Sequence, residues 1–146
     1  MSSRLNIFIE QFFELKIKNE GINLQRVQFN SLNSNIEYKF QNFRIKIETY
    51  FKEIYITLFN ERYRKDEINL FNLLEFLNQK NEIYPTSNYF HNEKDIDICI
   101  KKQLLFLSQI LIESFIQITE FFNDSKYLNN INKFYNYHRN KYSDLY

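Results

Sequence analysis

Apolar residues recur at steps of three and four along most of the chain, the spacing of one face of an α-helix. At the N-terminus this pattern predicts a first helix that stops at Gly21, a residue type common at helix C-termini. The apolar face of that helix would consist of Leu5, Phe8, Ile9, Phe12 and Leu15.

Three further stretches have helical spacing. A short helix is predicted from the leucines between residues 70 and 77, and two longer ones are predicted over 100–122 and 127–142. A polar and aromatic connection, 80–95, separates the short helix from the long ones. Residues 22–33 fit a helix, a strand or a linker.

The stretch from Ile36 to Phe59 supports two interpretations. Alternating Ile and aromatic residues fit strands, whereas the same stretch carries seven apolar residues at steps of three and four. Helix is favoured because Ser34 and Glu37 fit a capping box, and because Arg44 and Glu48 stand four apart with opposite charge. The chain also has no glycine after Gly21 to form tight hairpin turns.

The sequence therefore predicts an all-α single domain, 1–146, built as a bundle of about five helices. The alternative is an α+β fold with a small antiparallel sheet formed by residues 22–60.

Two predicted helices carry more apolar residues than one core face requires, which favours an interface with a second protein chain. On the helix over 36–59 the surplus residues and their basic neighbours form a predicted partner-binding stripe: Tyr38, Ile45, Ile56, Arg62, Tyr63 and Arg64. On the long helix over 100–122, one surplus side consists of Leu105, Ile112 and Ile116. The expected partner is another protein or a second copy of this chain.

The sequence contains none of the motifs that common enzyme mechanisms require. With one glycine and two histidines, it has no phosphate-binding loop, no nucleophile elbow and no paired zinc ligands. A metal site in the segment from His91 to Cys99 is disfavoured, because its ligand spacing matches no familiar type and its acidic residues suit a helix start. We expect no enzymatic activity, no cofactor and no metal.

The C-terminal segment mixes basic and aromatic residues, which could contact single-stranded RNA. The residues in question are Lys133, Tyr137, Arg139 and Lys141. Arg139-Asn140 also resembles the start of the Arg-to-His motif of helical HEPN ribonucleases, but Asp144 stands where that family has its histidine. The resemblance covers six residues and implies a degenerate, inactive relative at most.

Composition changes this picture little. The chain has 146 residues, of which 16 are Phe and 11 are Tyr, an abundance that an AT-rich genome produces. Its formal net charge of +1 gives no support to a broad basic surface. Glu10 and Glu14 interrupt the apolar N-terminus, and no stretch reaches the 20 or so apolar residues of a membrane span. We expect a cytoplasmic or organelle-interior protein that is not secreted. It would act as an inhibitor, an antitoxin or immunity-type factor, or an accessory subunit, with RNA binding as the alternative.

Overall fold

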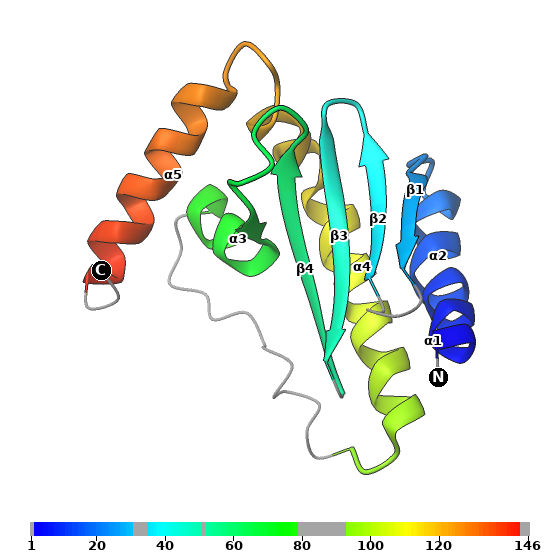
Figure 1. Cartoon of the computed structure of the whole chain (residues 1–146). Coiled ribbons are helices and arrows are strands. Elements are labelled where there is room, and N and C mark those ends of the chain that lie inside the picture. Colours follow the sequence, from blue (N-terminus) through cyan, green and yellow to red (C-terminus); the bar gives the residue numbers. More distant parts are fainter. Residues whose placement is uncertain (1, 31–34, 51, 79–92, 144–146) are drawn as a thin grey trace.

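Five antiparallel strands form a single sheet in which each strand pairs with its neighbour in the chain (Figure 1). The computed structural model describes residues 2–30, 35–50, 52–78 and 93–143. The strands are β1 (Gln25–Asn30), β2 (Asn35–Phe40), β3 (Phe43–Tyr50), β4 (Glu53–Asn60) and β5 (Ile68–Asn69). The helical elements are α1 (Ser2–Ile9), the π-helical turn η1 (Glu10–Glu14), α2 (Leu15–Asn19), α3 (Leu70–Asn78), α4 (Ile96–Phe121) and α5 (Tyr127–Lys141).

The predicted all-α bundle is wrong, because the stretch expected to form its second helix forms β2, β3 and β4. The α+β alternative is closer to the observed fold. The other four helical regions are confirmed, and Gly21 takes a positive φ of 82° directly after the first of them.

A tertiary contact explains why the β2–β3 hairpin forms without glycine. Gln41 adopts a positive φ of 53°, a conformation that costs a non-glycine residue about 1–2 kcal/mol. The next residue, Asn42, donates hydrogen bonds from its amide to the Phe122 carbonyl and, at 2.8 Å, to the Asp124 carboxylate. The end of α4 therefore holds the turn in place, and these partners lie about 80 residues away in the sequence.

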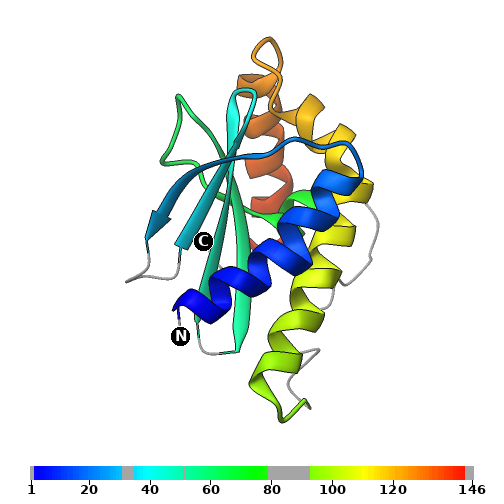
Figure 2. The same cartoon turned by 90° about the vertical axis from the view of Figure 1, so that its right-hand side faces the viewer.

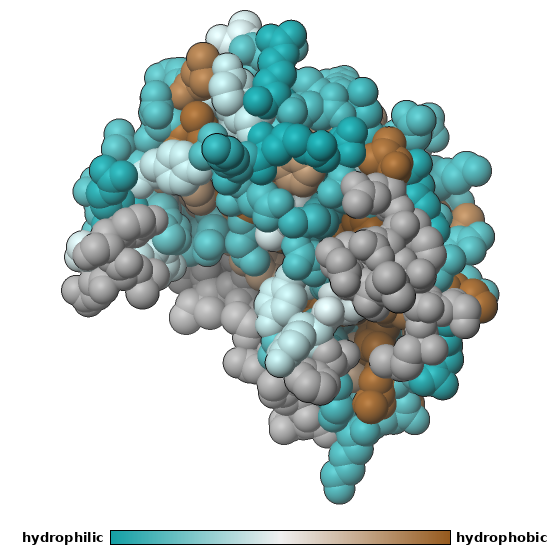
Figure 3. Space-filling model, viewed as in Figure 1, coloured by the Kyte–Doolittle hydropathy of each residue, from teal (hydrophilic) through white to brown (hydrophobic). Residues whose placement is uncertain are grey.

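The two faces of the sheet differ in chemistry, as alternation along a strand requires. The outer face carries ion pairs: Arg44 of β3 contacts Glu37 of β2 and Glu61 of the β4–β5 loop, both at 2.9 Å, and Lys46 contacts Glu67 of the same loop at 2.7 Å. Figure 3 views this face, and its coloured atoms are largely hydrophilic. Charges four apart lie on one face of a strand as well as of a helix, so the Arg44 and Glu48 spacing did not distinguish the two structures.

The inner face of the sheet packs against a layer of helices. The segment α1–η1–α2 and the long helix α4 lie side by side on this face (Figure 2). Phe43 stacks on Phe122 with ring centroids 4.8 Å apart, and Phe40 meets Phe115 edge to face at 4.7 Å. The core is therefore formed between the sheet and these two helical segments, and buried residues of α3 and α5 extend it.

The π-helical turn shifts the buried face of the N-terminal helix. The buried residues are Leu5, Ile9, Phe13 and Ile17, each four positions after the last. In a regular α-helix, steps of four drift by about 40° each, whereas the wider π turn keeps these residues on one side. The predicted face was correct at Leu5 and Ile9 but wrong at Leu15, which is exposed.

Helix α4 spans the whole sheet and begins at a side-chain cap. The Asp95 carboxylate accepts hydrogen bonds from the Asp97 and Ile98 backbone N–H groups, as the acidic start of this helix predicted. By length and composition alone, the 26-residue helix is long and apolar enough to cross a membrane. The fold accounts for much of that apolar character, because one side of α4 packs into the core.

Candidate functional sites

The predicted partner-binding stripe is not a continuous surface. Tyr38, Ile45 and Ile56 are 1%, 0% and 2% exposed, because they point from the strands into the core. These three residues are unavailable to a partner, which corrects the interpretation based on a helix over 36–59. Tyr63 stays at the surface and stacks on Tyr127 at a centroid distance of 5.5 Å.

The two arginines beside Tyr63 are exposed in the loop between β4 and β5. Arg64 contacts the Glu37 carboxylate at 3.4 Å, and its guanidinium lies 5.2 Å from the centre of the Phe59 ring. Arg62 donates its backbone N–H to the Asn60 side chain. Arg64 thus covers the sheet's outer face, where Phe59 is buried.

Two of the four predicted RNA contacts take part in docking α5. The Tyr137 ring meets Phe76 of α3 edge to face at 5.6 Å, and Lys141 forms an ion pair with Glu75 of the same helix. Lys133 and Arg139 are exposed on α5. The aromatic rings of α5 therefore pack against the protein, and no row of them is left open for bases to stack on.

An apolar stripe does lie on the outer side of α4. Ile98 and Leu105 are each 41% exposed, Ile116 is 75% exposed, and Ile112 is partly buried between them. Lys102 and Gln109 occupy the intervening positions and are exposed. We call these six residues the α4 stripe; Leu105, Ile112 and Ile116 are the surplus side expected from the sequence.

The neighbouring helical segment adds exposed apolar side chains to the same layer. Ile7 and Leu15 are both nearly half exposed. The Lys16 ammonium donates a hydrogen bond to the Leu105 carbonyl at 3.0 Å, which ties α2 to the middle of α4. Two adjacent helices therefore expose aliphatic residues that the core of this chain does not use.

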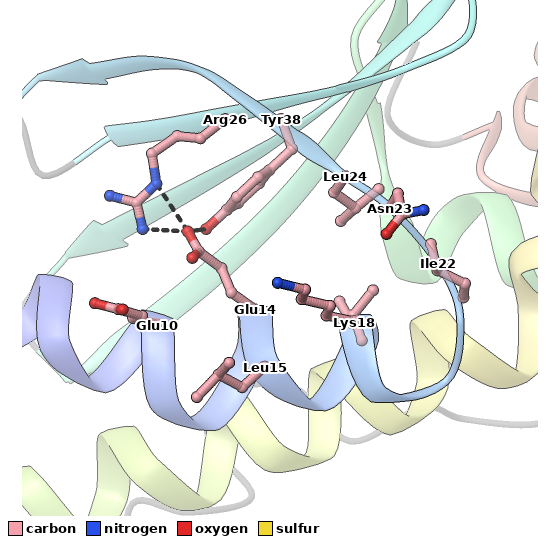
Figure 4. Close-up of a pocket in the computed structure, with 10 residues that line it drawn as sticks. Glu10, Glu14, Leu15, Lys18, Ile22, Asn23, Leu24, Arg26 and Tyr38 are labelled. Carbon is pink, nitrogen blue, oxygen red and sulfur yellow. Dashed lines mark hydrogen bonds and ion pairs between the residues drawn. The ribbon is translucent and has the colours of Figure 1, made fainter.

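A separate pocket of about 380 Å³ lies between the N-terminal helical segment and the start of the sheet (Figure 4). At one end, the Glu14 carboxylate accepts hydrogen bonds from Arg26 Nε at 2.8 Å, from Arg26 Nη2, and from the Tyr38 hydroxyl at 2.5 Å. Arg26 also donates to the Asn6 side chain at 2.8 Å. The residues lining the pocket are Glu10, Glu14, Leu15, Ile17, Lys18, Ile22, Asn23, Leu24, Arg26 and Tyr38.

Two backbone irregularities meet at this pocket. Glu14 is the last residue of the π-helical turn η1, and Arg26 stands beside a β-bulge, because the β1–β2 register shifts between Arg26 and Gln28. Arg26 pairs across the strands with Tyr38, so it shares the inner face of the sheet. Both kinds of irregularity occur preferentially near functional sites, where they redirect side chains.

The charges in the pocket favour binding over catalysis. Burial, reinforced by the hydrogen bond to Glu14, raises the pKa of Tyr38 far above its ordinary value, so the phenol keeps its proton. Burial alone would lower the pKa of Arg26, but its contacts with Glu14 and Tyr38 raise it, so the guanidinium stays charged. The cluster therefore provides fixed hydrogen-bond donors, not a group that exchanges protons near neutral pH.

Sequence reasoning missed this pocket entirely, since Glu14 and Arg26 belong to no motif. Among the residues that the structure describes, no three His, Cys, Asp or Glu side chains gather as metal ligands, and His91 lies outside those residues. No protein family, curated protein or solved structure significantly matches this chain.

Proposed function

We propose that this protein binds another protein through the α4 stripe, and that the partner contributes an amphipathic helix. The observation that carries the proposal is the exposure of Ile98, Leu105 and Ile116 along one line of a helix whose opposite side is buried in the core. Such binding suits an inhibitor, an immunity-type factor or an accessory subunit.

The spacing of the stripe favours a helix as the occupant. Its positions follow steps of four, three, four, three and four from Ile98 to Ile116, which is the seam of a helix that packs along a second helix. At 1.5 Å per residue the stripe is about 27 Å long, or five helical turns. A partner helix with apolar residues at the same spacing would cover it from end to end.

The energy available is large enough for specific binding. Burying a fully exposed Leu or Ile side chain contributes about 1.5–3 kcal/mol, so Ile98, Leu105 and Ile116, which are 41–75% exposed, could contribute a few kcal/mol before the cost of association. Lys102 and Gln109, at the intervening positions, would favour one register and orientation, as polar residues do in coiled coils.

Site-specific photocrosslinking tests the proposal. A photoreactive amino acid is placed at Leu105, at Ile116 and, as a matched control, at Leu128, which is 56% exposed on α5 and outside the stripe. We expect the same protein adduct from positions 105 and 116 and none from position 128. Sedimentation of the purified chain then decides whether the adduct is a second copy or a different protein.

Charge substitutions provide the second measurement. Ile116→Glu should abolish the adduct formed at position 105 and leave the circular dichroism spectrum unchanged, whereas Leu128→Glu should change neither. Equal crosslinking at positions 116 and 128 would contradict the proposal. An adduct that ribonuclease removes would transfer the function to RNA.

A further inference from the structure

We propose that the pocket between the N-terminal helical segment and β1 binds a small carboxylate with a short aliphatic body. This site is independent of the α4 stripe, so either proposal can fail without the other. Its basis is the Lys18 ammonium, which extends over the pocket beside apolar side chains (Figure 4).

The hydrogen-bond donor that faces the pocket is the ammonium of Lys18, because the Arg26 guanidinium is engaged by Glu14 and Asn6. The Lys18 ammonium extends over the pocket in Figure 4 and has no hydrogen bond or ion pair with the part of the chain that the structure describes. An incoming carboxylate could accept a hydrogen bond from the Lys18 ammonium.

The acidic residues do not cancel this preference for an anion. Glu14 already accepts from Arg26 and Tyr38, so its negative charge is compensated within the cluster. Glu10 lies two helical turns before Lys18, about 12 Å along the axis, and its carboxylate is at the far end of the pocket in Figure 4. The charge left near Lys18 is therefore positive.

The rest of the lining suits a hydrocarbon body. Ile22 and Leu24 provide apolar surface beside Lys18, and both are partly exposed, so this surface can be reached from solvent. A volume of about 380 Å³ lies within the range of about 300–1,000 Å³ found for small-molecule sites. One charged head and a chain of a few carbons match this combination of a cation and aliphatic surface.

Nuclear magnetic resonance titration of the full chain with butyrate, hexanoate and octanoate tests the inference. We expect saturable shifts of the amides of residues 14–18 and 22–26 at ligand concentrations below about 10 mM, which corresponds to a weak but specific site. Lys18→Gln should weaken the affinity about tenfold. Lys65→Gln, which removes an exposed lysine in another loop, should leave it unchanged.

Octanol and octylamine separate the contribution of the charge from that of the hydrocarbon. Octylamine should cause no saturable shifts at these residues, and octanol should bind at least about tenfold more weakly than octanoate. Three results would overturn the inference: no saturation with any of the carboxylates, equal affinity for octanol and octanoate, or an affinity that Lys18→Gln leaves unchanged. None of these results bears on crosslinking at the α4 stripe.

Discussion

Removing the side-chain hydroxyl should lower the free energy of unfolding at one buried tyrosine, Tyr38, but not at another, Tyr127. Tyr38 and Tyr127 are 1% and 2% exposed. The Tyr38 hydroxyl donates to the Glu14 carboxylate at 2.5 Å, whereas the Tyr127 hydroxyl has no hydrogen-bond partner within the described residues. Substitution by phenylalanine keeps the ring in both cases and removes one oxygen atom.

The expected magnitudes follow from these surroundings. Tyr38→Phe loses a hydrogen bond to a charged group, worth about 1.5–3 kcal/mol, and should lower the free energy of unfolding by that amount. Burying a hydroxyl without a partner costs about 1–3 kcal/mol, so Tyr127→Phe should leave the free energy of unfolding unchanged or raise it by about 1 kcal/mol. The two variants should therefore differ by at least about 1.5 kcal/mol.

Urea unfolding followed by circular dichroism measures the difference. The slope of the free energy against urea concentration should be the same in both variants, because neither changes the surface exposed on unfolding. In thermal melts, each kcal/mol corresponds to about 2–4 °C for a chain of this size. If Tyr127→Phe destabilised the protein as much as Tyr38→Phe, the Tyr127 hydroxyl would have a partner and the reasoning from burial would be refuted.

Three further predictions concern the turn, the outer face of the sheet and the core. Gln41→Gly should raise the free energy of unfolding by about 0.5–1 kcal/mol by relieving the positive φ of 53°, while Gln41→Ala should not; urea unfolding of both variants checks this. The hydrogen bond from Arg44 lowers the pKa of Glu61, so its contribution to stability is present above the ordinary glutamate pKa of about 4.5 and is lost as the pH falls below it. Melts from pH 7 to 3 should fall less steeply for Glu61→Gln than for the unmodified protein. Phe115→Ala should lower the free energy of unfolding by about 3–5 kcal/mol, because its ring packs against Phe40 and Phe43; a loss below 1 kcal/mol would contradict its place in the core.

The helices that the sequence predicted correctly are those with one periodicity only. In α4 and α5 the buried residues recur at steps of three and four, and no period of two competes with that spacing. Such helices bury one face whatever the rest of the fold is, so the local pattern is sufficient to predict them. The surplus apolar side of α4 could be identified for the same reason.

Residues 36–59 satisfy both periodicities, so only turn chemistry distinguishes helix from strand in the sequence. A tight hairpin turn without glycine is locally unfavourable, and Gln41 does adopt a strained positive φ. What offsets the strain is the hydrogen bonding of Asn42 to Phe122 and Asp124, together with the Glu61 N–H donated to the Asn42 carbonyl at 3.0 Å. Tertiary partners of this kind cannot be found from a window of neighbouring residues.

The pocket illustrates the same limit in a stronger form. Glu14 and Arg26 stand twelve residues apart, and they meet only because a π-helical turn and a β-bulge each add one residue to a regular element. The apolar spacing from Leu5 to Ile17, four residues at every step, is the one trace of the π turn in the sequence, since a regular α-helix would carry Ile17 off the buried face. If a π turn replaces part of the uniform rotation of 100° per residue, the four apolar residues fall on one side of the helix and Glu14 falls at the edge of that side. A carboxylate at the edge of a buried face needs a cation as its partner, and Arg26 is that cation.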